Sequence, residues 1–180
     1  MIALIAMLLA TGAEAGEGAT LWGFNGTAIL NSVSDSKSNA WGIYQETPTK
    51  YGIWDLGYLN EGDQQTCVAQ TLKVCFGDKR DGMFALYEIP WKLSKNLQTS
   101  FALGPYFSAT TVTEPNGIDY HDAYRTDLLT KASVTYVFND RWKTSLDWWR
   151  VMYSTNDFVQ DGMPARGDSD VFSISIGRSF

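Results

Sequence analysis

The sequence lacks an apolar run long enough for a membrane helix, and it has few residues of the kinds that build metal or nucleic-acid sites. No segment approaches the roughly 20 consecutive apolar residues that cross a bilayer as a helix. The net charge of −6, with its basic residues scattered, argues against nucleic acid as a partner. A single pair of cysteines with no histidine nearby makes a poor metal site, and no EF-hand spacing occurs among the acidic residues. We therefore expect no metal site and no cofactor.

The first 15 residues contain no lysine or arginine, yet they have the other features of an export signal. Residues 1–10 are apolar, and Ala13 and Ala15 have the small-residue spacing of a cleavage site. We expect residues 1–15 to be a signal peptide and residues 16–180 to form a single domain. Export leads to an oxidising compartment, so we predict a disulfide between Cys67 and Cys75.

The last ten residues alternate strictly between two kinds of side chain. One face is apolar and the other is small and polar, in the order Phe172, Ile174, Ile176 and Phe180 against Ser173, Ser175, Gly177 and Ser179. Successive side chains of a strand point to opposite sides, so this segment predicts a strand with one apolar wall. Serine and glycine suit the crowded lumen of a narrow barrel better than a water-facing sheet surface, so we interpret the strand as a transmembrane one.

Similar alternating runs recur along the chain, with turn-forming residues between them. They predict eight strands, at Thr20–Asn31, Asn39–Glu46, Tyr51–Asn60, Gly82–Lys92, Leu97–Thr111, Asp127–Phe138, Trp142–Tyr153 and Ser169–Phe180. The register of the first, fourth and seventh runs stays open by one residue, which would exchange their two faces. Pro105 cannot donate to a ladder, so we expect an irregularity in the fifth strand.

The connections between these runs are sorted by length. Short turns follow the second, fourth and sixth runs, whereas longer polar segments follow the others, the longest being Glu61–Asp81. Tight turns at one end and long loops at the other are typical of outer-membrane barrels. We therefore predict an all-β fold, an eight-stranded antiparallel up-and-down transmembrane β-barrel whose closure leaves no strand edge in lipid.

Aromatic residues gather toward the ends of the apolar faces, where amphipathic rings suit the headgroup region. The expected aromatic girdle comprises Trp22, Phe24, Trp54, Tyr58, Trp91, Phe107, Tyr136, Phe138, Trp142, Trp148 and Phe172.

The polar faces predict a lumen filled by side chains, because an eight-stranded barrel is narrow. The expected lumen residues are Glu46, Asp55, Glu88, Ser100, Tyr106, Lys131, Ser133, Thr135, Lys143, Ser145 and Asp147. Buried charges need partners, so the charged residues should form an ion-pair network, with Asp55, Glu88, Lys131, Lys143 and Asp147 as its main members. A gated ion path through the same lumen is the alternative.

The signal-like start, the eight alternating segments, the sorted loops and the terminal Phe180 resemble the small outer-membrane barrels of the OmpA transmembrane-domain and OmpX size class. The resemblance implies a location in the bacterial outer membrane, with membrane lipid and lipopolysaccharide as partners. It also implies that the barrel-assembly machinery recognises the last strand during insertion, through Phe172, Ile174, Ile176 and Phe180.

The single histidine, His121, lies beside Asp122 in the third long loop and could act as a general base toward a hydroxyl. Two families of small outer-membrane barrels act on lipid A in this way, the palmitoyltransferase and the 3-O-deacylase. The chain lacks the His-x-Ser-Asn stretch of the deacylase and an amphipathic N-terminal helix like that of the palmitoyltransferase. His121 and Asp122 are therefore catalytic candidates only for an alternative function.

Three functions remain open at this point. The leading hypothesis is a non-enzymatic outer-membrane protein with a structural or surface-interaction role, carried by its long extracellular loops and directed at an unknown surface ligand. The second is a lipid A-modifying acyl hydrolase or acyltransferase that acts at the outer leaflet. The third is a soluble lipocalin-like carrier, with apolar faces turned inward around a ligand.

Overall fold

The computed structural model describes residues 18–30, 36–68, 74–113, 119–121, 125–152 and 168–180. Within these ranges, the side chains of residues 30, 36, 65–68, 74–76, 78, 112 and 119–121 are not described. The expected signal peptide therefore lies outside the described residues. In the described ranges, no helix has the length and apolar character needed to cross a bilayer.

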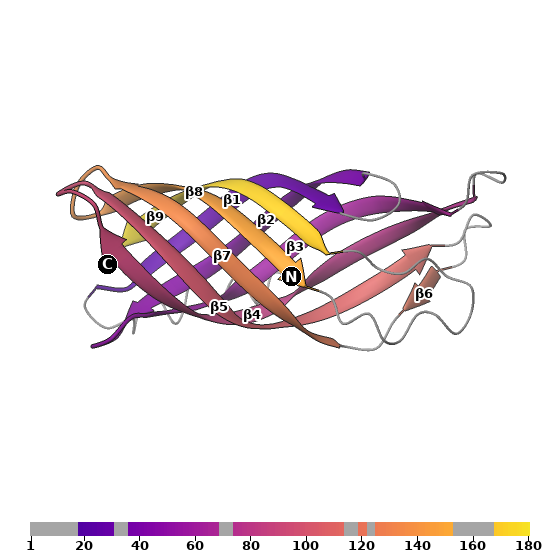
Figure 1. The fold of residues 1–180 in the computed structure, drawn as a ribbon, viewed down its shortest axis with the longest axis horizontal. Helices are drawn as coiled ribbons and strands as arrows, with labels where there is room; N and C mark the ends of the chain where they lie inside the picture. The colour runs from indigo at the N-terminus through magenta and orange to yellow at the C-terminus, as the bar shows by residue number, and fades with distance from the viewer. Residues whose placement is uncertain (1–17, 31–35, 69–73, 114–118, 122–124, 153–167) are drawn as a thin grey trace.

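Nine strands occur in the described part of the chain, and eight of them close into a barrel (Figure 1). They are β1 Thr20–Leu30, β2 Ser36–Pro48, β3 Ile53–Val68, β4 Val74–Lys92, β5 Leu97–Thr113, β6 Asp119–His121, β7 Arg125–Val137, β8 Trp142–Met152 and β9 Ser169–Ser179. Neighbouring strands pair antiparallel in the order β1–β2–β3–β4–β5–β7–β8–β9, and β9 pairs with β1. The short β6 pairs with the far end of β5 and is no part of the ring. The predicted eight-stranded up-and-down barrel is confirmed.

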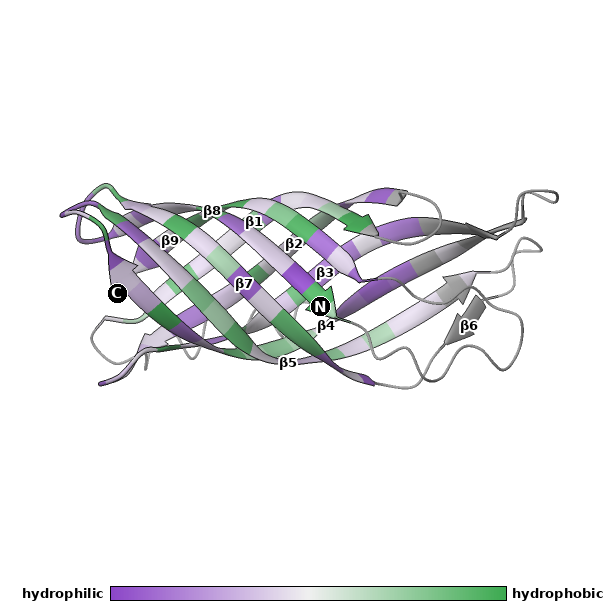
Figure 2. Ribbon diagram, viewed as in Figure 1, coloured by the Kyte–Doolittle hydropathy of each residue, from purple (hydrophilic) through white to green (hydrophobic). Residues whose placement is uncertain are grey.

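Side chains alternate between the lumen and the outside along every strand of the barrel. In β9 the exposed side chains are Phe172, Ile174, Ile176 and Arg178, while the residues between them are buried. Figure 2 shows hydrophobic and hydrophilic residues following one another along the strands. The exterior is therefore apolar, which is the surface that a transmembrane barrel presents to lipid.

The short connections all lie at the end of the barrel where the chain ends (Figure 1). Hydrogen bonds close them tightly: the amide of Thr49 donates to the carbonyl of Gly52 over 2.7 Å. In the turn after β7, the Asn139 side chain accepts from the amides of Arg141 and Trp142 over 2.9 and 3.0 Å. Such turns fix the register of the strands that they join.

At the opposite end, β3 and β4 extend well beyond the rest of the barrel (Figure 1). The sequence prediction placed a long polar loop at Glu61–Asp81, and this was wrong, because most of it continues the two strands as far as Val68 and Val74. A bulge between Asn60 and Gly62 shifts the register there, and Gly62 has a φ of +77°, which favours glycine. Beyond the bulge the two strands pair again in a new register.

The irregularity expected at Pro105 is a gap in the β4–β5 ladder. Pairing stops after Phe84–Tyr106 and resumes at Tyr87–Leu103 in the same register. A Cβ at Gly104 would lie 2.0 Å from the carbonyl oxygen of Ala85, so the two strands stay close across the gap. The missing proline donor therefore interrupts the ladder without bulging the strand.

The predicted orientation of the β1 side chains was wrong, because the face expected to point outward points into the lumen. Trp22 and Phe24 were expected in the outer girdle, but they point into the lumen and are 1% and 6% exposed. The reason is the register of β1, in which Trp22 lies opposite Tyr44 and both rings are buried. Elsewhere the girdle residues face outward, among them Trp54, Trp91, Trp142, Trp148 and Phe172.

Candidate functional site

The lower lumen, toward the short turns, holds a buried ion cluster centred on Lys131 of β7. The Lys131 Nζ lies 2.5 Å from Asp55 Oδ2 of β3 and 2.5 Å from Glu88 Oε2 of β4. All three side chains are at most 3% exposed. Such burial removes water from every charge, so the ammonium and the two carboxylates must compensate one another.

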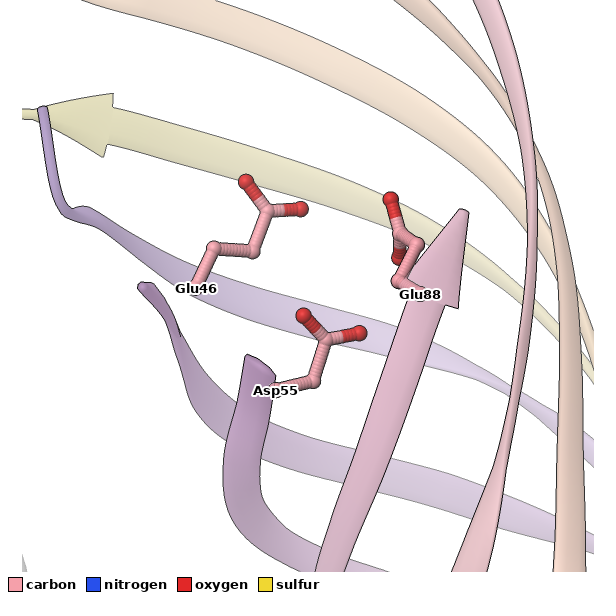
Figure 3. A group of neighbouring side chains, drawn as sticks. All are labelled: Glu46, Asp55 and Glu88. Atoms are coloured by element: carbon pink, nitrogen blue, oxygen red, sulfur yellow. The ribbon is translucent and has the colours of Figure 1, made fainter. Parts of the chain in front are cut away.

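A third carboxylate, that of Glu46 on β2, completes the cluster. Figure 3 shows the carboxylates of Glu46, Asp55 and Glu88 turned toward one another from three adjacent strands, and their ligand atoms lie within 4.8 Å of one another. Lys143 Nζ is 3.9 Å from Glu46 Oε2 and donates to Thr20 Oγ1 over 3.0 Å. Three carboxylates could in principle hold a cation, but the Lys131 ammonium already contacts two of them and supplies positive charge.

Above this cluster, five aromatic side chains fill the middle of the lumen. We call them the aromatic plug, which consists of Trp22, Phe24, Tyr44, Phe84 and Trp149. The plug is closely packed, with ring centroids 5.0 Å apart for Phe24 and Trp149 and 5.9 Å apart for Trp22 and Tyr44. Lys131 Nζ lies 4.6 Å from the Tyr44 centroid and 5.3 Å from that of Trp149, so the plug also contacts the charge.

Asp147 of β8 lies in a separate network of hydroxyl groups. Ser145 Oγ donates to its carboxylate over 2.5 Å, and Ser175 Oγ is in contact with the other oxygen. Thr135 Oγ1 donates to Ser145 over 3.2 Å and extends the network to β7. The sequence grouped Asp147 with the lysines, but the structure gives its carboxylate hydroxyl partners instead.

The upper lumen contains polar residues that the sequence analysis missed. Glu61, Gln64 and Arg80 are buried, with exposures of 0%, 1% and 0%. Ser108 Oγ donates to Asp127 Oδ2 over 2.9 Å near the same end. Glu61, Gln64 and Arg80 lie in the segment expected to be a loop, where the bulge breaks the alternation that would have marked them as inward-facing.

The remaining site candidates fall largely on parts that the structure does not describe. Backbone pairing places His121 opposite Thr111 on β5, but the His121 side chain and all of Asp122 lie outside the described residues. Pairing also places Cys67 directly opposite Cys75, with both side chains outside the description. The apolar residues of the last strand are on the outer face, where Phe172, Ile174, Ile176 and Phe180 are 53 to 61% exposed.

No protein-family model and no curated protein matches the sequence. Solved structures do match, and they cover nearly the whole chain. Neisserial surface protein A has a TM-score of 0.62 at 11% identity, with 91% of this chain and 96% of that chain covered. The outer membrane protein OprG from Pseudomonas aeruginosa has a TM-score of 0.57 at 12% identity, with the same two coverages.

A third similar structure is Ail, the attachment invasion locus protein of Yersinia pestis, in complex with the heparin analogue sucrose octasulfate. Its TM-score is 0.56 at 9% identity, with 91% of this chain and 99% of that chain covered. The fold is that of the small eight-stranded outer-membrane barrels. These neighbours are bacterial outer-membrane proteins, and the apolar exterior of the barrel agrees with the same location.

The lumen is thus a packed interior. Its lower part is a compensated ion cluster, and its middle is closed by the aromatic plug. The arrangement can stabilise a closed barrel.

Proposed function

We propose that this protein is a non-enzymatic integral protein of the bacterial outer membrane, closed to solutes and active through contacts at the cell surface. One observation carries the proposal: a filled lumen lies below a sheet that extends beyond the barrel. The outward-facing hydrophobic side chains are the reverse of what a soluble lipocalin-like carrier requires. The partners in this proposal are membrane lipid and lipopolysaccharide around the barrel.

The closed state follows from what fills the lumen. A conducting path would have to pass both the aromatic plug and the Lys131 cluster, in which Lys131, Asp55 and Glu88 are at most 3% exposed and bound to one another. Separating such a pair without water to replace it costs several kcal/mol. We therefore expect the folded protein to show no steady ion conductance. The alternative of a gated ion path through the lumen predicts that conductance occurs.

The surface role is supported by the part of the sheet above the bulge. There β3 pairs with β4, β4 pairs with β5, and β5 pairs with β6. Pairing between β2 and β3 ends at Trp41–Asn60. Residues 63–68 of β3 pair with β4 on one side, and among the described residues no strand pairs with them on the side away from β4. An unpaired edge can bind an extended segment of another protein through backbone hydrogen bonds.

Three further features belong to the same proposal. Export by the signal peptide of residues 1–15 would bring the chain to the assembly machinery, which would recognise the apolar side of β9. A disulfide between Cys67 and Cys75 would tie the end of the β3–β4 hairpin, because the two residues are cross-strand partners. A tied hairpin keeps its edge straight, and a straight edge is what pairing with another strand requires.

The test compares the full chain with a variant in which residues 63–79 are replaced by a two-residue Asn-Gly turn. Cells that display each form are measured for adhesion to a panel of purified extracellular-matrix proteins, and the purified barrels are measured for conductance in planar bilayers. We expect adhesion with the full chain only, no conductance with either form, and heat-modifiable gel migration for both. Equal adhesion by the two forms, or a steady conductance of the full chain, would contradict the proposal.

A further inference from the structure

The outer face of β1 differs from the outer faces of the other barrel strands. Three successive outward positions, Gly23, Asn25 and Thr27, are exposed and carry no apolar side chain. We call these three residues the β1 notch. In β9, next to it, the outward positions are Phe172, Ile174 and Ile176, which are 53 to 61% exposed. The notch is therefore a polar gap in a mostly apolar band.

The notch lies at the depth of the hydrocarbon. Asn25 is paired with Ile174 of β9 on one side and with Trp41 of β2 on the other, and both of these neighbours face outward. Asn25 is five residues above the start of β1. With a rise of about 3.3 Å per residue and a tilt of about 40°, it lies roughly 13 Å above that end, near the middle of an apolar band about 25 Å tall.

Three other polar side chains on the outer face are satisfied within the barrel wall. Thr99, Thr130 and Thr144 each donate to a backbone carbonyl of the neighbouring strand, over 2.9, 3.4 and 2.9 Å. Among the described residues, no partner is found for the side chains of Asn25 and Thr27. An amide without a hydrogen bond in hydrocarbon is costly, because no water is present to replace the missing partner.

We propose that the β1 notch is the interface of a homodimer in the membrane, in which the Asn25 amides of two copies bond to each other. A two-fold axis along the membrane normal brings each residue of the notch close to its own copy. An amide carries both a donor and an acceptor, so two asparagines related by this axis satisfy each other. A second copy is the occupant that meets this need, because lipid tails offer no hydrogen bond.

The shape of the notch favours the same partner. A Cβ added at Gly23 would have no atom within 4 Å, so this position leaves open space at the surface. Small residues at a membrane interface let two backbones approach closely, and the large side chains beside them can then pack across the gap. Trp41 and Ile43 border the notch on β2, and Ile174 and Ile176 border it on β9.

The dimer is compatible with the surface function proposed above. In the ring, β1 lies between β2 and β9, whereas the extended sheet is formed by β3, β4, β5 and β6. β5 is on the opposite side of the ring from β1. The two proposals can therefore fail separately, since one concerns the membrane band and the other concerns the sheet above it.

Cross-linking in native outer membranes tests the interface. Thr27→Cys, which keeps the Asn25 amide, is introduced in a chain with Cys67→Ser and Cys75→Ser, and the matched control is Leu103→Cys on the outer face of β5, where Leu103 is 45% exposed. Mild oxidation should give a disulfide-linked dimer of the Thr27→Cys chain at several times the yield of the control. Equal yields would show random collision and overturn the proposal, as would a product that links the chain to a different protein.

A second measurement isolates the amide. Asn25→Val replaces the amide by an apolar side chain, and it should weaken dimerisation about tenfold, as two lost hydrogen bonds in a membrane predict. Sedimentation equilibrium of the otherwise unchanged protein in detergent gives this dissociation constant, and heat-modifiable migration shows that the barrel is folded. Gly23→Leu fills the open space and should weaken the dimer as well. A wild-type protein that stays monomeric, or an Asn25→Val dimer of unchanged affinity, would overturn the inference.

Discussion

The strands β3 and β4 pass through two environments, and the two parts differ in how their polar residues are held. Within the barrel, Asp55 and Glu88 are buried and bound to Lys131 at 2.5 Å. Beyond the bulge, Asp63 and Lys79 are exposed on the projecting sheet. Charges in the first part depend on protein partners, whereas exposed charges in the second part have water. The same pair of strands therefore holds its charges by protein partners in one part and exposes them to water in the other.

The largest effect predicted by this comparison is that of Lys131→Met. It removes the ammonium and leaves two buried carboxylates without a positive partner, so we expect the free energy of unfolding to fall by about 3 to 5 kcal/mol. The matched variant Lys79→Met, on the projecting sheet, should change it by less than about 0.5 kcal/mol. Urea titration in detergent, followed by heat-modifiable gel migration, measures both.

A compensating variant sharpens this prediction. Adding Asp55→Asn and Glu88→Gln to Lys131→Met removes the three charges in direct contact and should restore most of the lost stability, because Glu46, the carboxylate that remains in the cluster, still has Lys143 at 3.9 Å. If Lys131→Met costs no more than Lys79→Met, the cluster is not what stabilises the barrel, and the comparison between the two parts fails.

The alternation of side chains made the barrel part predictable from sequence, and the same reason explains where prediction stopped. In β9, lipid on one side and a filled lumen on the other enforce a strict pattern, and the predicted strand ends within one residue of the observed one. Above the bulge this contrast is lost, so the strands were read as a loop. Glu61 and Arg80 were missed for this reason.

Register accounts for the other differences. Trp22 and Phe24 resembled girdle residues because they are aromatic, but the outward side of β1 is the polar one, with Asn25 and Thr27. Alternation alone placed Lys131 in the lumen. Which acids it meets depends on the stagger with which the sheet closes, since Asp55 comes from β3 on the other side of the lumen. That stagger is a long-range property, and a single sequence does not encode it in any local pattern.

A smaller and more local effect is expected for Cys67 and Cys75. Reduction of the predicted disulfide should increase proteolysis within residues 61–81, because the end of the hairpin loses its cross-link, and it should leave the barrel strands protected. The measurement is limited proteolysis of outer-membrane vesicles with and without a reductant, with the Cys67→Ser and Cys75→Ser double variant as the control. Equal cutting in both redox states of the unchanged chain would mean that no bridge is present. The projecting sheet would then be held by backbone pairing alone.

The smallest effect is predicted for His121, which tests whether the projecting sheet carries chemistry in addition to contacts. His121 lies on β6, which pairs with β5 outside the ring of eight strands, so we expect His121→Ala to leave the acyl pattern of lipid A unchanged. Mass spectrometry of lipid A from cells that lack the gene, express it, or express the variant measures this directly. A gain or loss of an acyl chain that depends on His121 would restore the lipid A-modifying alternative. The position of His121 favours the negative result. β6 pairs with the part of β5 that lies beyond the last β5–β7 pair. His121 therefore lies above the barrel wall, whereas the acyl chains of lipid A lie alongside that wall.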